Sequence, residues 1–148
     1  MKQYAQKALI ILHIHYIALI NMHKILNKIT MAKEMIAVMS RCYKTKKLFG
    51  IRFDKNKGNE WEAAWAFPLK EGADKREKGY AVSIKGSFVL GNDYPGCPYC
   101  GNPSYFMCGA CGKFSCHDGK TKHVICPHCG NEGDLASPIT EIRGDGNF

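Results

Sequence analysis

Residues 97–130 read CPYCGNPSYFMCGACGKFSCHDGKTKHVICPHCG and contain seven of the eight cysteines of the chain. A Cys-x-x-Cys-Gly unit occurs three times in this stretch, beginning at Cys97, Cys108 and Cys126. Two residues between the sulfurs let a tight turn present both thiolates to one metal ion, and the following glycine can adopt positive φ. Three such units so close together predict that this stretch folds around metal ions.

Two other uses of the cysteines fit the sequence less well. A disulfide framework needs an oxidising compartment, and the apolar run at residues 8–20 is not followed by the small-x-small site of a cleaved secretory signal. A thioredoxin-like redox pair uses one Cys-x-x-Cys at a helix start, whereas these units repeat among glycines and strand-like residues. We expect tetrahedral Zn²⁺ held by thiolates, one or two ions per chain, with rubredoxin-like iron as a variant because four sulfurs suit either metal.

The pairing of the units is open. Pairing the two Cys-Pro-x-Cys-Gly units leaves a gap of 25 residues between them. Pairing the second unit with the third leaves a gap of 14 residues, but the first unit then has no partner. We favour the former scheme, which makes one site of four cysteines: Cys97, Cys100, Cys126 and Cys129. A second metal then takes three further cysteines and a fourth ligand. The three are Cys108, Cys111 and Cys116; the candidates for the fourth are His117, His123, His128 and Cys42, and we include His117 in the predicted set.

The predicted sites are closed and structural. Catalytic zinc keeps a position open for water, usually beside His and Glu ligands, whereas thiolate-rich sites are structural. The sequence has no H-E-x-x-H motif, no deaminase pattern, no nucleophile elbow and no phosphate-binding loop. We therefore expect that the protein is not an enzyme.

Residues 1–40 differ from the rest of the chain. They contain five of the six Met residues, no Cys, and five Lys against one Glu. Their apolar run at residues 8–20 is shorter than the roughly 20 residues of a spanning helix, and two histidines interrupt it. We expect a helical N-terminal extension without membrane contact, with a second helix beginning at Thr30 as N-cap. Translation from Met39 is an alternative start.

The remaining segments read as strands and turns. Residues 48–53 are predicted to form one strand. In a second strand, residues 61–67, the alternation places these side chains on one face: Trp61, Ala63, Trp65 and Phe67. In a third, residues 80–90, the side chains on one face are Val82, Ile84, Phe88 and Leu90, and Gly86 marks a bulge or a close approach of another backbone segment. A charged loop at residues 70–79 separates the last two strands. The chain is thus predicted to be small and mainly β. Its predicted segments are the N-terminal helical extension (1–40), a short β-sheet (41–95), a zinc-ribbon-like segment (96–135) and a flexible tail (136–148).

Charge favours a protein partner over nucleic acid. The chain of 148 residues has a formal net charge of +8 and a pI of about 9.1, but half of this excess lies in residues 1–40, and thiolates that hold a metal add negative charge. Between Cys97 and Cys129 only Lys113, Lys120 and Lys122 are basic, opposed by Asp118. We therefore expect protein docking, with nucleic-acid binding as the alternative.

Several short motifs together resemble one known family. They are Cys42-Tyr43-Lys44-Thr45, Gly50-Ile51, Trp65-Ala66-Phe67, Gly86-Ser87-Phe88, Tyr94-Pro95-Gly96, and the three cysteine units with Lys113. From Arg41 to Leu135 the chain resembles the TerY-C metal-binding domain. The resemblance implies a cytoplasmic, non-catalytic accessory module of bacterial tellurium-resistance and stress-response systems. The von Willebrand factor A domain of TerY-type proteins and its Asp-x-Ser-x-Ser motif are missing from this sequence, so adhesion-type binding does not carry over.

Overall fold

A computed structural model describes residues 15–23, 34–73 and 83–143 of the chain. The chain divides into two units, residues 1–33 and residues 34–148. In the first unit residues 15–23 form a helix, which confirms the expected N-terminal helix for those residues. Among the described residues, no helix has the length and apolar content needed to cross a bilayer. The start of the second helix expected at Thr30 lies outside the described residues.

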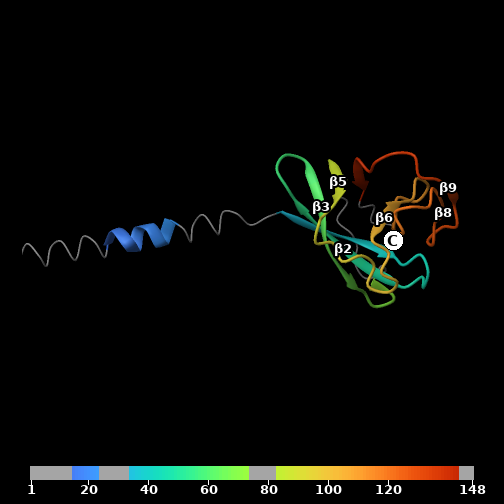
Figure 1. Cartoon of the computed structure of the whole chain (residues 1–148), viewed down its shortest axis with the longest axis horizontal. Coiled ribbons are helices and arrows are strands. Elements are labelled where there is room, and N and C mark those ends of the chain that lie inside the picture. Colours follow the sequence, from blue (N-terminus) through green and yellow to red (C-terminus); the bar gives the residue numbers. More distant parts are fainter. Residues whose placement is uncertain (1–14, 24–33, 74–82, 144–148) are drawn as a thin grey trace, which may run out of the picture. The chain divides into compact units, whose positions relative to one another are not determined.

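The second unit is built on one six-stranded sheet (Figure 1) with the order β5-β3-β2-β1-β7-β6. Two further pairs, β10 with β4 and β8 with β9, form small sheets of two strands each. The bounds are β1 Met35–Arg41, β2 Leu48–Lys55, β3 Glu60–Pro68, β4 Ser83–Lys85, β5 Ser87–Leu90, β6 Ser104–Met107, β7 Phe114–His117, β8 His123–Ile125, β9 Glu132–Asp134 and β10 Glu141–Arg143. The prediction of a small, mainly β protein is confirmed.

Strand β1 corrects the prediction for residues 35–40. The sequence predicts a helix for these residues within the N-terminal extension, but all of β1 pairs with β2, from Met35↔Asp54 to Arg41↔Leu48. Their alternation explains the outcome: Ile36 and Val38 pack against the core, and Ser40 is fully buried. Pairing with a buried strand outweighs the helix propensity of Met and Ala. The extension therefore ends before residue 34, not at residue 40.

A bulge in β3 changes the predicted face of its second half. Trp61 and Ala63 are buried as expected, but the register shifts opposite Arg52 and Phe53. Beyond the shift Ala66 faces the core and Trp65 is 53% exposed. The alternation predicted for residues 61–67 therefore holds only as far as Ala63.

Gly86 is the close approach that the sequence predicted. It separates β4 from β5, and a Cβ at this position would collide with the backbone carbonyl oxygen of Asn59. After this point Phe88 is buried against Trp61, its partner in the parallel β3–β5 pair. Leu90, expected on the buried side, is 46% exposed at the edge of the sheet. Val82 and residues 74–79 of the predicted loop lie outside the described residues.

Two strands of the cysteine-rich segment, β6 and β7, are part of the main sheet. Strand β7 pairs in parallel with the end of β1 at Ser40↔Phe114 and Arg41↔Ser115, and β6 extends the sheet beyond β7. The C-terminal residues also belong to the fold, because β10 pairs with β4 and Ile142 is buried. The predicted flexible tail is therefore wrong for residues 139–143, where Ile139 packs against the core.

The core is centred on Phe53, which is fully buried on β2. Its ring contacts Phe88 of β5, Phe114 of β7 and Tyr105 of β6, with centroid separations of 5.4–6.1 Å. Because β5 and β6 are the two edges of the six-stranded sheet, the sheet curves so that both edges reach one aromatic side chain. The end of β1 lies next to β7 because the two strands pair, and the segment after β5 reaches the same region.

Candidate metal centre

The eight cysteines form two groups of four. Site 1 consists of Cys42, Cys97, Cys100 and Cys116; site 2 consists of Cys108, Cys111, Cys126 and Cys129. Within each site the sulfur atoms all lie within 4.8 Å of one another, and all eight cysteines are free thiols. The sites interleave along the sequence, because site 2 begins before site 1 is complete.

The sulfur spacing fits tetrahedral metal coordination. The Sγ atoms of Cys100 and Cys116 are 3.6 Å apart, those of Cys108 and Cys129 are 3.8 Å apart, and those of Cys111 and Cys126 are 3.7 Å apart. A tetrahedron of sulfurs with metal–sulfur bonds of about 2.3 Å has edges of about 3.8 Å. Disulfides need about 2.0 Å. Both groups thus have the donor set and dimensions of a closed four-thiolate site.

The grouping differs from the favoured prediction. The unit at Cys126 pairs with the unit at Cys108 across 14 residues, the scheme that the sequence analysis set aside. The first unit is completed instead by Cys116 from β7 and by Cys42, which directly follows β1. The parallel β1–β7 pairing explains this arrangement, because it carries Cys42 and Cys116 to the same end of the sheet.

The three Cys-x-x-Cys-Gly units share one backbone turn. In each, the amide of the first cysteine donates to the carbonyl five residues later, and the glycine amide donates back to the carbonyl of that cysteine, at 2.8–2.9 Å. The three glycines have φ of 70–75°, the left-handed region that favours glycine. The glycines of the three units are Gly101, Gly112 and Gly130.

Cys42 begins a fourth turn of the same kind. Its amide donates to the Lys47 carbonyl at 2.9 Å, and the amide of Lys46 donates back to the Cys42 carbonyl at 2.9 Å. Lys46 has a φ of 64°, the position that glycine occupies in the other turns. Thr45 stands where the second cysteine would be. The sequence hides this unit, since Cys42-Tyr43-Lys44-Thr45-Lys46 lacks both the second Cys and the Gly.

Hydrogen bonds to sulfur prepare each site for a cation. Tyr43 donates its amide to Cys116 Sγ at 3.2 Å, and Thr45 donates its amide to Cys42 Sγ at 3.3 Å. Burial raises the pKa of Cys42, but hydrogen bonds from the side chain and amide of Thr45 outweigh it and lower that pKa to about 6.

Three other thiols, those of Cys97, Cys111 and Cys116, are harder to ionise. Burial raises the pKa of Cys97 to about 11 and that of Cys111 to about 12, and it raises the pKa of Cys116 further. In site 2, burial also raises the pKa of Cys108, but the amides of Cys111 and Ala110 lower it to about 7. Cys42 and Cys108 therefore ionise more readily than Cys97, Cys111 and Cys116, whose thiolates a cation would stabilise, so metal binding releases protons.

The three candidate histidines lie outside both groups of sulfurs. His117 was in the predicted ligand set, but its Nδ1 accepts a hydrogen bond from the amide of Gly119 at 3.0 Å and its Nε2 lies 2.7 Å from the Thr121 carbonyl. It points away from Cys116 because consecutive strand residues face opposite sides. His128 Nε2 lies 2.8 Å from the Phe114 carbonyl, and His123 Nδ1 lies 2.9 Å from Asp134. The eighth sulfur comes from Cys42.

Comparison with known proteins gives one match. The family model described as the TerY-C metal binding domain matches residues 32–147. No curated protein and no solved structure matches the chain. The matched range begins before β1 and includes all eight cysteines.

Proposed function

Because the chain belongs to the family of TerY-C metal-binding domains, we propose that it is a non-catalytic module in which two structural zinc ions support a surface for a protein partner. The metal-binding part of this proposal rests on one observation: all eight cysteines divide into two four-sulfur sites of tetrahedral dimensions. Four thiolates per ion leave no position for water, which argues against hydrolytic chemistry.

Zinc is the proposed metal because it favours closed thiolate sites and undergoes no redox change. The test is elemental analysis of the purified full chain together with X-ray absorption at the metal edge. Two zinc ions per chain, each with sulfur neighbours at about 2.3 Å, support the proposal. A coloured protein that contains iron overturns the assignment of the metal.

The proposed docking surface is the outer face of the main sheet. Cross-strand pairing places Ala37, Arg52 and Trp65 in one row, on the side opposite the core residues Ile51 and Phe53. Trp65 is 53% exposed, and Met35, further along the same face of β1, is 61% exposed. A large exposed aromatic side chain beside Arg on a sheet face is typical of the centre of a protein interface.

A matched pair of variants tests this surface. Trp65→Ser is expected to abolish co-purification of the partner with the tagged full chain from its own cells, with the metal content unchanged. Leu90→Ser removes a similarly exposed apolar side chain from an edge strand and should leave co-purification intact. Equal loss in both variants, or in neither, contradicts the proposed surface.

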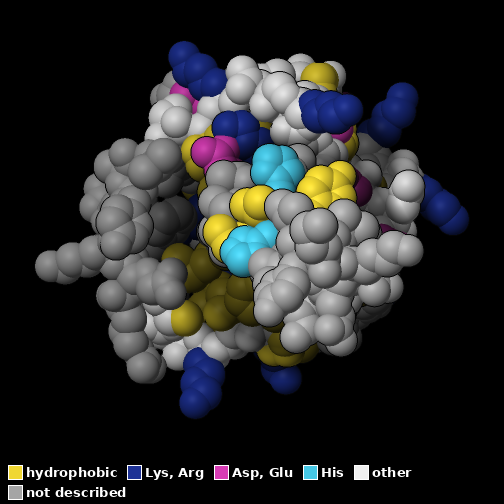
Figure 2. Space-filling view, turned by 90° about the vertical axis from the view of Figure 1, so that its left-hand side faces the viewer, with side chains coloured by type: hydrophobic (Ala, Val, Ile, Leu, Met, Phe, Trp, Pro, Cys, Tyr) yellow, Lys and Arg dark blue, Asp and Glu magenta, His cyan; other side chains and the backbone are white. Residues whose placement is uncertain are grey.

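Nucleic-acid binding is the second candidate, supported by the basic turn after Cys42. Lys46 Nζ lies 4.9 Å from the centre of the Tyr43 ring, and Lys47 Nζ lies 5.6 Å from that of Tyr99, so basic and aromatic groups alternate there. The face in Figure 2 has Lys and Arg side chains projecting singly from separate places rather than in one patch.

The charge balance also favours protein docking. Eight thiolates with two divalent ions leave four negative charges, equal to the excess of sixteen Lys and Arg over twelve Asp and Glu in residues 41–148. A titration over salt separates the two candidates, since affinity for nucleic acid falls steeply as salt rises.

A role in bacterial tellurium resistance and stress response, in the cytoplasm, is proposed from the family resemblance. Growth of a deletion strain on tellurite and under DNA damage tests this role. Increased sensitivity supports it, and wild-type sensitivity counts against it.

A further inference from the structure

The two metal sites differ in their access to solvent. In site 1, Cys42 and Cys116 are fully buried, Cys97 is 3% exposed, and all three belong to the hydrophobic core. Each site has one half-buried cysteine, Cys100 in site 1 and Cys111 in site 2, but only site 2 has an exposed one, Cys129. An incoming ligand can therefore approach a metal ion in site 2 past Cys129, whereas protein atoms surround most of site 1.

Site 1 is also attached to the main sheet through each of its parts. Cys42 follows β1, and Cys116 lies within β7, the strand that pairs with β1. The turn that carries Cys97 and Cys100 is fixed by Tyr99, whose hydroxyl donates to the Leu48 carbonyl of β2 at 2.7 Å. Opening site 1 therefore requires separation of central strands of the fold.

Half of site 2 is carried by a small hairpin. The turn with Cys126 and Cys129 joins β8 to β9, which pair only with each other and lie apart from β2 and β3 (Figure 1). Of the six residues in these strands, only Val124 is buried. The hairpin turn contacts β7 through His128, whose Nε2 lies 2.8 Å from the Phe114 carbonyl. Few buried contacts therefore oppose local opening of the hairpin.

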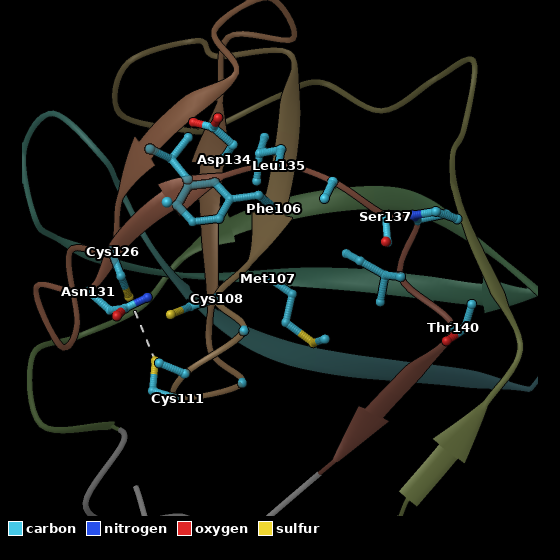
Figure 3. Close-up of a pocket in the computed structure, with 18 of the residues that line it drawn as sticks. Phe106, Met107, Cys108, Cys111, Cys126, Asn131, Asp134, Leu135, Ser137 and Thr140 are labelled. Carbon is cyan, nitrogen blue, oxygen red and sulfur yellow. Dashed lines mark hydrogen bonds between the residues drawn. The ribbon is translucent and has the colours of Figure 1, made fainter.

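A pocket of about 680 Å³ gives a second approach to site 2. Its wall includes Cys108, Cys111 and Cys126, and Figure 3 shows these residues on one side with Ser137 and Thr140 across from them. None of the cysteines of site 1 lines this pocket. A small chelating molecule that enters it lies next to three of the four cysteines of site 2.

We propose that site 2 is a metal-exchange site, which gives its ion to and takes it from small multidentate chelators, while site 1 exchanges its ion much more slowly. The inference rests on the proposed two-metal function. The exchange is a ligand substitution: metal–sulfur bonds to the four cysteines break as bonds to the donor atoms of the chelator form, and the released thiolates take up protons from the solvent. No electron is transferred. The occupancy of site 2 by metal thereby changes with the free metal concentration.

The test begins with the full chain loaded with zinc and mixed with an excess of the coloured chelator pyridylazoresorcinol. The result expected is two release phases of equal amplitude, with rates at least about tenfold apart because opening of the hairpin breaks far fewer contacts than opening of the sheet. Release of both ions in one phase overturns the proposal. A zinc content of only one ion per chain before mixing, measured by elemental analysis, contradicts the two-metal function itself, so the two failures are distinguishable.

Two neighbouring variants assign the phases. Val124→Ala removes the one buried side chain of strands β8 and β9 and should accelerate the fast phase by about five- to twentyfold, with the slow phase unchanged. Ile125→Ala is the matched control, because Ile125 is 47% exposed on the same strand, and it should change neither phase. Acceleration of the slow phase by Val124→Ala overturns the assignment.

A measurement on the unmodified chain covers the case in which Val124→Ala does not fold. After the fast phase alone, the amide NMR spectrum should change for residues 108–112 and 123–134 and stay the same for β1, β2, β3 and β7. Changes centred on Cys42 and the ends of β1 and β2 would mean that site 1 empties first and would contradict the proposal.

Discussion

Lys46 and Gly112 have equivalent positions in two turns that start at different cysteines. Each donates its amide to the carbonyl of the cysteine four residues earlier, at 2.9 Å for Lys46 and 2.8 Å for Gly112. Their φ angles are 64° and 70°. The equivalence makes Cys42 the first residue of a fourth metal-binding turn, although its local sequence contains neither a second cysteine nor a glycine.

The positive φ predicts a cost for side chains in these turns. Gly112→Ala should lower the free energy of unfolding of the metal-loaded protein by about 1–2 kcal/mol, measured by urea denaturation, because an L-residue is strained in this region. A Cβ at Gly112 meets no atom within 4 Å, so the cost is conformational and not steric.

Gly109, in the same turn, is the control. It also has open space around a Cβ, but its φ is not positive. Gly109→Ala should leave stability within about 0.5 kcal/mol of the parent or raise it slightly. Equal losses at Gly109 and Gly112 would argue against the turn geometry.

The β8–β9 hairpin contains a pH-dependent ion pair between His123 and Asp134. The hydrogen bond from His123 to Asp134 raises the pKa of His123 above its ordinary value of 6.5. Because the folded-state pKa is raised, the contribution to stability is complete below the unfolded value and is lost as pH rises through the folded one.

Titration of the His123 ring by NMR measures this effect. Asp134→Asn should lower the pKa of His123 towards its ordinary value, and Glu132→Gln should lower it less, since Glu132 lies 3.7 Å away. An unchanged pKa in Asp134→Asn would show that the pair does not form in solution.

A chain that starts at Met39 should be much less stable than the full chain. It lacks Met35–Val38 of β1 and therefore the pairs from Met35↔Asp54 to Val38↔Ile51. Loss of the packing of Ile36 and Val38 against the core, together with the strand hydrogen bonds, should cost about 3 kcal/mol or more. The measurement is denaturant unfolding, with a chain that starts at Glu34 as the control. Equal stability of the two truncated chains would contradict the assigned role of β1.

Local patterns in the sequence predicted what depends on near neighbours. The three Cys-x-x-Cys-Gly units, the β-strands around Phe53 and Trp61, and the close approach at Gly86 follow from spacing and alternation, and the structure contains them. Each of these features is decided by a few consecutive residues, which is why the sequence alone is sufficient to predict it.

Long-range pairing decided the features that the sequence analysis predicted wrongly. Residues 35–40 became a strand because β2 was available to pair with them, and the parallel contact of β1 with β7 brought Cys42 to Cys116. Neither contact leaves a local signal. The fourth turn also leaves none, because its sequence lacks the second Cys and the Gly, and a φ of 64° is unusual for a residue such as Lys46.

Metal content of two single variants tests the central assignment most directly. Cys42→Ser should reduce the zinc bound per purified chain from two ions to one, because it removes the eighth sulfur and opens site 1. His117→Gln should retain two ions, since His117 bonds to Gly119 and Thr121 and not to metal. Two ions in Cys42→Ser together with one in His117→Gln would contradict the arrangement of two interleaved four-cysteine sites.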